Sequence, residues 1–425
     1  MINRSVVIKT TSVLAVATMM QWFNFFIAAV AAATVWPSVF FPQRTLGLTL
    51  SIVAYAVTFV TRPVGALFLG MIGDSFGRKA SNVLALILMA LGSLGIAATP
   101  SYAKINILAP TLVIVFRLLQ GLGIGGQWGS AVALVSELTA NSKRRTFWTS
   151  LVQAGLPLGM ALAIFGTILL IEISGRTFLT FGWRIMFIIG VLFIVLSSII
   201  IRNVSESPFL TKKQDFHLLQ SISNLKKYKK DLLKLVFAEV YEVGTSSIVI
   251  IPFSVTFLSL SSLSVTDSLA SVGIADLLAA TTIIIVGFLS GKVNKKRLFL
   301  LLSTGLSAIM VSYPYPLLLK SHALIFVIIA QSSLFSFLEM GYSVLGAFFA
   351  EHFPTEFRST GVNLSYQLSA AIVGSINIIA ITIILPLVNG LTNALIYITS
   401  IAALLCTISF CTLLTSLKET SGLPI

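Results

Sequence analysis

Four carboxylic acids lie inside long apolar runs of this 425-residue chain: Glu239, Glu242, Asp276 and Glu339. A carboxyl group surrounded by hydrocarbon takes up a proton at moderate cost, so it can couple proton entry to a conformational change. Asp276 and Glu339 lie deepest in their runs, which predicts that one of them is the proton-coupling group. Glu239 lies closer to the start of its run, where it could instead be interfacial.

Two arginines, Arg62 and Arg117, also fall within apolar runs. An isolated cation there costs at least about 2.5 kcal/mol, so each needs a partner. One interpretation is that the guanidinium group grips a ligand carboxylate through two parallel hydrogen bonds. The other is hydrogen bonding between helices. We favour the second for Arg62, whereas for Arg117 both stay open and we keep it as a candidate substrate-binding residue.

Asn363 and Gln367 interrupt another apolar run. They are four residues apart, so a helix would place them on one face. We therefore predict that both belong to a substrate-binding cavity.

A glycine-dotted apolar stretch ends abruptly in charges between residues 62 and 79 (RPVGALFLGMIGDSFGRK). Gly65, Gly70 and Gly73 predict a smooth helix surface that a neighbouring backbone can approach closely. Asp74, Arg78 and Lys79 then end the apolar run, and Gly77 permits a tight turn because glycine adopts positive φ without strain. The two flanking runs are therefore expected to be antiparallel neighbours.

This stretch resembles the G-x-x-x-D-x-x-G-R-[RK] loop of major facilitator superfamily transporters. The preceding Arg62-Pro63-x-Gly65 is similar to the metabolite:proton symporter branch, whose members carry small organic acids, amino acids and betaines. Further stretches that resemble the branch are Gln21-Trp22-Phe23-Asn24, Arg117 to Gly129, Ser205 to Phe209, and Ala350 to Arg358.

The resemblance implies a substrate cavity lined by Gln21, Asn24 and Gln127, three amides that stand where the branch usually has acids. An amide does not titrate, so the N-terminal half would offer hydrogen bonds but no proton carrier. The alternative is that these amides only hold helices together.

The composition indicates a membrane protein, because 56% of the residues are hydrophobic and 10% are charged. Soluble domains average about 25% charged residues. We predict an all-α membrane protein of twelve transmembrane helices in two pseudo-symmetric six-helix bundles. The apolar runs fall at residues 11–36, 45–72, 80–98, 109–138, 146–174, 183–201, 232–260, 267–291, 298–319, 323–353, 360–387 and 393–417.

Two repeated spacings indicate that the halves are duplicated. Glu137 precedes Arg144 by seven residues, and Glu351 precedes Arg358 by seven, each pair following the fourth run of its half. With Asp74 and Arg78, these residues resemble the cytoplasmic gate of the superfamily, in which ion pairs close one end of the cavity. The alternative is that they only set topology and cap helices.

The predicted units are residues 1–201, a basic cytoplasmic linker at 202–231, and residues 232–425. Most of the 28 Lys and Arg residues fall in alternate connections on the side of Asp74, which predicts cytoplasmic termini in a multi-pass cell-membrane protein. The lysines after residue 225 form either an amphipathic helix on anionic lipid or a solvated linker.

We therefore expect an alternating-access transporter of a small polar metabolite, with protons as the coupling ion and no enzymatic activity. A uniporter, an exporter or a non-transporting nutrient receptor on the same fold are the alternatives. We expect a monomer in the lipid bilayer, with no cofactor, metal or nucleic acid. Gly121-x-Gly123-x-x-Gly126 matches a dinucleotide fingerprint, but no strand precedes it and the stretch continues as an apolar helix.

Overall fold

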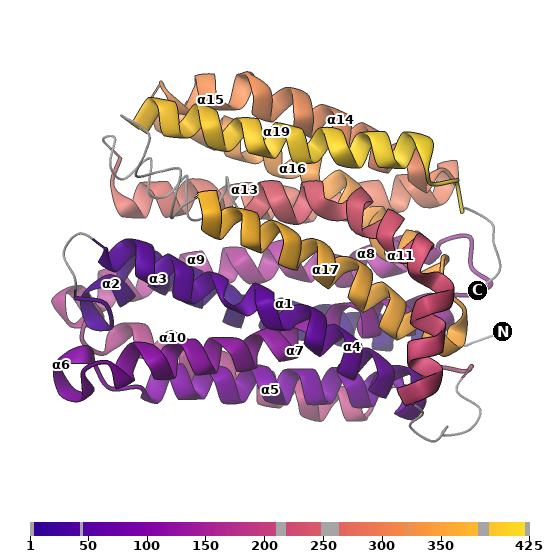
Figure 1. Cartoon of the computed structure of the whole chain (residues 1–425), viewed down its shortest axis with the longest axis horizontal. Coiled ribbons are helices and arrows are strands. Elements are labelled where there is room, and N and C mark those ends of the chain that lie inside the picture. The colour runs from indigo at the N-terminus through magenta and orange to yellow at the C-terminus, as the bar shows by residue number, and fades with distance from the viewer. Residues whose placement is uncertain are drawn as a thin grey trace.

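The helices of the chain form two bundles that lie side by side, and the helices of both run roughly along the long axis of the molecule (Figure 1). The computed structural model describes residues 4–42, 46–209, 218–247, 263–321, 323–380 and 391–420. The N-terminal half forms one bundle, drawn in indigo and magenta, and the C-terminal half forms the other, in red, orange and yellow (Figure 1).

Six spans make up the N-terminal bundle. Two of them are broken helices: α3 meets α4 at Val57, and α8 meets α9 at Ala154. The elements are α1 (Arg4–Thr34), α2 (Trp36–Val39), α3 (Gly47–Ala56), α4 (Thr58–Phe76), α5 (Arg78–Ala98), α6 (Tyr102–Ile105), α7 (Leu108–Leu138), α8 (Arg145–Gln153), α9 (Gly155–Ser174), η1 (Gly175–Phe178) and α10 (Gly182–Arg202).

The C-terminal bundle repeats this plan with α11 (Leu218–Thr245), α13 (Val265–Val293), α14 (Lys296–Ser312), α15 (Pro314–Leu319), α16 (Leu324–Ala350), η3 (Thr355–Phe357), α17 (Arg358–Ile379) and α19 (Leu391–Thr415). The expected ends of the seventh and eleventh runs, at residues 260 and 387, lie outside the described residues.

Length and composition of the helices support a membrane-spanning fold. Nine helical segments within the described ranges are long and apolar enough to cross a bilayer, and α11, α14 and α17 occupy the remaining three positions. Large apolar side chains face outward, among them Phe68 (51% exposed), Leu192 (64%) and Ile309 (67%). Such a surface is stable against lipid, not water. The predicted fold class is confirmed.

The two bundles meet where α4 packs along α17 and where α9 packs along α13. We call this contact surface the seam. A Cβ atom added at Gly70 would lie 2.6 Å from the Thr360 Cα atom, and one at Gly73 would lie 2.5 Å from the Ser359 hydroxyl. Gly65 makes an equally close approach to the Leu122 backbone of α7. The predicted role of these glycines in close helix packing is therefore confirmed.

The turn between α4 and α5 has the predicted backbone conformation, because Gly77 adopts φ 114°. This value lies in the region that glycine favours.

The basic segment after α10 enters α11 without a break between residues 231 and 232. Tyr228 stacks on Phe357 at a ring-centroid distance of 5.8 Å, which fixes the first turns of α11 against the C-terminal bundle. The lysines at 226, 227, 229 and 230 are exposed, and residues 210–217 of the expected linker lie outside the described part of the chain.

Gly70→Ala is expected to lower the midpoint of thermal unfolding of the purified protein, because overpacking a tight contact costs about 1–3 kcal/mol. Gly291→Ala is the matched control, since its nearest atom would lie 3.6 Å away, in ordinary van der Waals contact. Equal stability of the two variants would contradict the assignment of the α4–α17 contact.

Candidate functional site: a charged cavity at the seam

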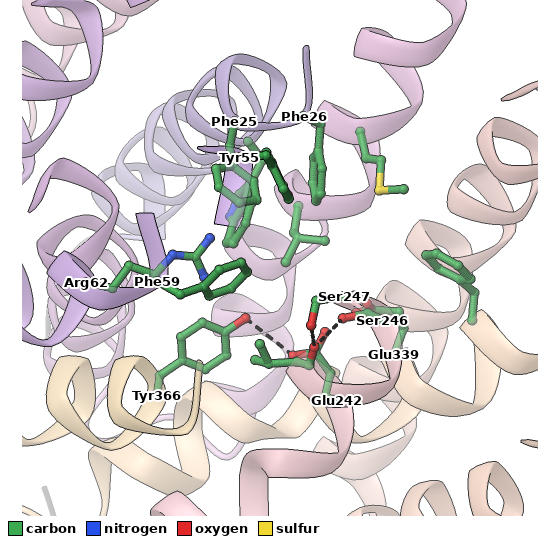
Figure 2. Close-up of a pocket in the computed structure, with 15 residues that line it drawn as sticks. Phe25, Phe26, Tyr55, Phe59, Arg62, Glu242, Ser246, Ser247, Glu339 and Tyr366 are labelled. Atoms are coloured by element: carbon green, nitrogen blue, oxygen red, sulfur yellow. Dashed lines mark hydrogen bonds between the residues drawn. The ribbon is translucent and has the colours of Figure 1, made fainter. Parts of the chain in front are cut away.

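A small cavity lies between the two bundles (Figure 2). Its volume is about 50 Å³, room for one or two water molecules. The N-terminal bundle contributes α1, α3, α4 and α9 to its wall, and the C-terminal bundle contributes α11, α16 and α17. Most of the lining is apolar or aromatic; the charged and polar side chains are Arg62, Glu242, Ser246, Ser247, Glu339 and Tyr366, with Tyr55 and Trp22 beside them.

Arg62 is the cation of this cavity, and its guanidinium group is only partly satisfied. The side chain is 1% exposed, with its guanidinium carbon 4.2 Å from the Phe59 ring centroid and 4.6 Å from that of Phe25. Nε and Nη2 have no hydrogen-bond partner in the described structure. Aromatic faces stabilise a guanidinium group but leave its in-plane donors free. An anionic ligand would satisfy them.

Three carboxylic acids of the C-terminal bundle lie close to one another on the other side. Glu242 and Glu339 line the cavity, and Glu239 lies one turn before Glu242 on α11. Glu242 accepts a hydrogen bond from the Tyr366 hydroxyl at 3.3 Å (Figure 2). Both oxygens of Glu239 and Oε2 of Glu339 are buried without a hydrogen-bond partner of normal geometry among the described residues. We call Glu239, Glu242 and Glu339 the acidic cluster.

Asp276 lies outside the cavity lining. It is buried in α13, and neither of its carboxylate oxygens has a hydrogen-bond partner within the part of the chain described. Its carboxyl group lies within electrostatic reach of Glu339, one member of the acidic cluster.

The three amides expected from the N-terminal half do not line the cavity. Asn24 donates hydrogen bonds to the Gly190 and Met20 carbonyl oxygens at 3.0 and 2.9 Å, and Gln127 donates to the Thr18 hydroxyl at 3.0 Å. Gln21 is fully buried in α1. In this conformation the side-chain donors of Asn24 and Gln127 bond within the N-terminal bundle.

Arg117 lies behind the cavity wall. It donates to Gln120 Oε1 at 2.6 Å and to the Tyr55 carbonyl oxygen at 2.8 Å, and it also bonds the Thr58 hydroxyl at 3.2 Å. Its guanidinium group is 4.7 Å from the Tyr55 ring centroid, so it supports a residue that lines the cavity.

Asn363 and Gln367 connect the two bundles. Asn363 accepts a hydrogen bond from the Gly129 backbone at 2.8 Å, and Gln367 donates to the Ile124 carbonyl oxygen at 3.2 Å. Both side chains therefore hold α17 against α7 in the closed seam. Substrate contact by either residue would require these bonds to open.

Aromatic side chains form a second layer behind the cavity. The ring centroid of Trp128 lies 4.5 Å from the ring centroid of Tyr366 and 5.9 Å from that of Tyr342. This stack fixes the hydroxyl group that contacts Glu242. The sequence alone did not identify Glu242 as a cavity residue. One signal was present: Ser246 follows Glu242 by four residues, so a helix places both polar side chains on one face.

A dense set of ion pairs closes the seam at one end of the molecule. Glu137 lies 3.0 Å from Arg78 and 2.8 Å from Arg358, and Arg78 also pairs with Asp74 at 2.6 Å. Asp74 accepts hydrogen bonds from the backbone nitrogens of Ser359 and Thr360, both at 2.9 Å. These nitrogens belong to the first turn of α17, where the helix dipole favours an anion.

A second group of ion pairs lies at the same seam. Glu351 pairs with Arg145 of the N-terminal bundle at 2.6 Å and with Lys296 of the C-terminal bundle at 3.0 Å. Arg144, the residue expected from the repeat spacing, is exposed instead. We call the residues Asp74, Arg78, Glu137, Arg145, Lys296, Glu351 and Arg358 the gate cluster.

Known proteins resemble the chain along most of its length. It is 30% identical over 387 residues to the inner membrane metabolite transport protein YhjE of Escherichia coli, covering 85% of this chain and 84% of that protein. It is 26% identical to a putative proline/betaine transporter of Staphylococcus haemolyticus, with 90% of this chain and 81% of that protein covered. It is also 26% identical to the shikimate transporter of Escherichia coli, with 83% of this chain and 82% of that protein covered.

The fold also matches a solved structure. The proton:xylose symporter XylE, bound to 6-bromo-6-deoxy-D-glucose, superposes with a TM-score of 0.81 at 16% identity, covering 99% of this chain and 98% of that one. The sequence model of the Major Facilitator Superfamily matches residues 14–376. With two six-helix bundles enclosing a cavity at their seam, this chain belongs to the Major Facilitator Superfamily of transporters.

Proposed function

We propose that the protein is a proton-coupled secondary active transporter of a small metabolite that carries a carboxylate group, of the organic acid, amino acid or betaine class. The observation that carries this proposal is the buried guanidinium group of Arg62, which has two unpaired nitrogens in a cavity shared by both bundles. Burying unpaired donors is costly, so a ligand that accepts their hydrogen bonds gains that free energy on binding.

The shape and charge of the cavity suit such a ligand. A guanidinium fork binds a carboxylate through two parallel hydrogen bonds. Trp22, Phe25 and Phe59 would pack against the apolar part of the molecule, and the unpartnered indole nitrogen of Trp22 offers a further donor. Shikimate, proline and betaine, named for the relatives, each carry one carboxylate, which supports this class.

Coupling to protons is supported by the acidic cluster. The amides Gln21, Asn24 and Gln127 leave no titratable group at those positions, whereas Glu339 lines the cavity and Asp276 lies behind it. Protonation of an acid beside the substrate removes one negative charge from the cavity, and so changes the net charge that is buried when the seam is closed.

The two bundles would move against each other to open the cavity alternately to each side. The gate cluster pairs side chains of both bundles at one end of the seam, where α1 begins and α19 ends (Figure 1). The positive charge at that end supports a cytoplasmic gate and cytoplasmic termini in the cell membrane. One chain forms the whole cavity, so a monomer would suffice.

An uncoupled uniporter is the second candidate, because the N-terminal amides remove the acids that the branch usually has there. It predicts the same Arg62 dependence but no response to a pH gradient.

Uptake into proteoliposomes tests the proposed function with four labelled probes: shikimate, L-proline, glycine betaine and xylose. We expect at least one carboxylate probe, and not xylose, to accumulate when the outside is acidic. Arg62→Gln should reduce that uptake about tenfold to a hundredfold, since a charged hydrogen bond contributes about 1.5–3 kcal/mol. Arg144→Gln removes an exposed arginine and serves as the control.

Accumulation of xylose alone would contradict the proposed substrate class, and full activity of Arg62→Gln would contradict the proposed site. Uptake of a carboxylate probe that ignores the pH gradient would favour the uniporter.

Glu137→Gln tests the gate. It leaves Arg78 and Arg358 without their shared anion, a loss that costs about 3–5 kcal/mol for a buried pair. We expect faster maleimide labelling of a cysteine placed at Ser130, whose hydroxyl lies 2.7 Å from the Ser359 hydroxyl across the seam. The matched control is Glu356→Gln, which changes an exposed carboxylate. Identical labelling rates in both variants would count against a gate role.

A further inference from the structure

Outside the gate cluster, the buried charges of the described spans are divided between the bundles by sign. Arg62 and Arg117 belong to the N-terminal bundle, whereas the acidic cluster and Asp276 belong to the C-terminal bundle. Arg62 of α4 and Glu242 of α11 line the same cavity from opposite sides (Figure 2). Their charges lie within electrostatic reach, but no direct ion pair joins these two described side chains. The space between them is where a ligand carboxylate would enter.

Several groups face Glu242 from the elements packed around it. Arg62 approaches from α4, the Tyr366 hydroxyl from α17, and Glu339 and Tyr342 from α16, while Glu239 precedes it on α11. Among the described lining residues, Arg62 is the cation that shares the cavity with Glu242. Like charges at close range disfavour each other, so the cluster can hold a single negative charge more easily than two or three. Arg62 favours placing that charge on Glu242, the acid of the cluster within its electrostatic reach.

We propose that Glu242 is the proton-coupling residue, and that its carboxylate and the carboxylate of the substrate compete for Arg62. This inference rests on the proposed function and adds the identity of the proton site and the rule that couples the two ligands. When the substrate carboxylate binds Arg62, the Glu242 carboxylate loses its cation. It then takes up one proton from the aqueous compartment to which the cavity is open and becomes a neutral acid.

This competition accounts for coupling. Substrate without a proton would leave two carboxylates beside one guanidinium group, and a proton without substrate would leave Arg62 with no anion. Both states bury an uncompensated charge at the seam, which is strongly unfavourable. If only the guanidinium group, Glu242 and the substrate carboxylate are counted, the empty carrier and the carrier with both ligands each hold one positive and one negative charge. The ammonium group of a zwitterionic substrate such as proline or betaine is carried in addition to these. The seam therefore closes over both ligands or over neither, at one proton per carboxylate.

Infrared difference spectroscopy of the purified protein tests the proton site with no substrate present. As the pH is lowered, the wild type should gain the carbonyl stretch of a protonated carboxyl group. Glu242→Gln should lack this band. Arg62→Gln should move its midpoint to higher pH by about one unit or more, because an adjacent cation favours the ionised acid. Glu242→Asp keeps a titratable group and should restore the band.

The same spectra can also overturn the assignment of the proton site to Glu242. If Glu339→Gln or Asp276→Asn removes the Arg62-sensitive band and Glu242→Gln keeps it, the assignment to Glu242 is overturned. A midpoint that is unchanged in Arg62→Gln would overturn the competition. Because this arm uses no substrate, it stays readable even if none of the carboxylate probes is transported.

A transport arm uses whichever of shikimate, L-proline or glycine betaine accumulates. Glu242→Gln removes the titrating group, so it should lose at least about tenfold of the accumulation driven by a pH gradient when accumulation is normalised to the variant's own rate of exchange of internal for external probe. Accumulation at the wild-type level would overturn the proposal. If Glu242→Gln fails to fold, Glu242→Asp decides instead, through a shifted pH dependence of accumulation.

Discussion

A charged group inside a bilayer needs a partner, and this requirement shapes the structure. In the described chain, most ionisable side chains buried in the spans lie at or next to the seam between the bundles, whereas Arg117 bonds within the N-terminal bundle. At the gate end they are paired: each carboxylate of the gate cluster has a cation or a helix N-terminus within hydrogen-bond range. In the cavity they are not, since Arg62 and the acidic cluster keep unpartnered polar atoms. In the proposed function, the satisfied charges hold the seam closed and the unsatisfied ones bind the substrate.

Two helices connect the gate cluster to the cavity. α4 carries Arg62 in the cavity and Asp74 in the gate cluster, and α17 carries Tyr366 in the cavity and Arg358 in the gate cluster. The glycine contacts bring these two helices together closely enough for Asp74 to reach the first turn of α17. Under the proposed function, a change of charge around Arg62 would therefore act on the same two helices that the gate cluster joins.

Much of the fold follows from local patterns. Uninterrupted apolar runs separated by charged connections predict spans, and repeated Glu–Arg spacings predict duplicated halves. The same spacing led to Arg144, although its neighbour Arg145 pairs with Glu351. Adjacent residues at the start of a helix differ by about 100° in direction, and the sequence does not say which of the two faces the partner bundle.

The cavity was harder to predict because it depends on which helix faces meet across the seam. Depth along a run pointed to Asp276 and Glu339, yet depth does not distinguish a face toward the cavity from one toward a neighbouring helix. Glu242 and Asp276 lie at similar depths in their runs, but Glu242 lines the cavity with Arg62 and Asp276 does not. Amides are ambiguous for a different reason. An asparagine amide can both donate and accept hydrogen bonds, so Asn24 or Asn363 can bind a ligand or hold two helices together. In this conformation Asn24 donates to the Gly190 carbonyl oxygen and Asn363 accepts from the Gly129 backbone.

The central claim is that the two bundles separate at the gate end when the cavity charge changes. Spin labels on Lys143 and Lys295, exposed on opposite bundles at that end, would report this separation by double electron–electron resonance in a background without Cys406 and Cys411. We expect two distance populations, with the longer one growing at acidic pH in the presence of a transported carboxylate and dominating in Glu137→Gln. A single distance, unchanged by pH, probe and this substitution, would contradict it.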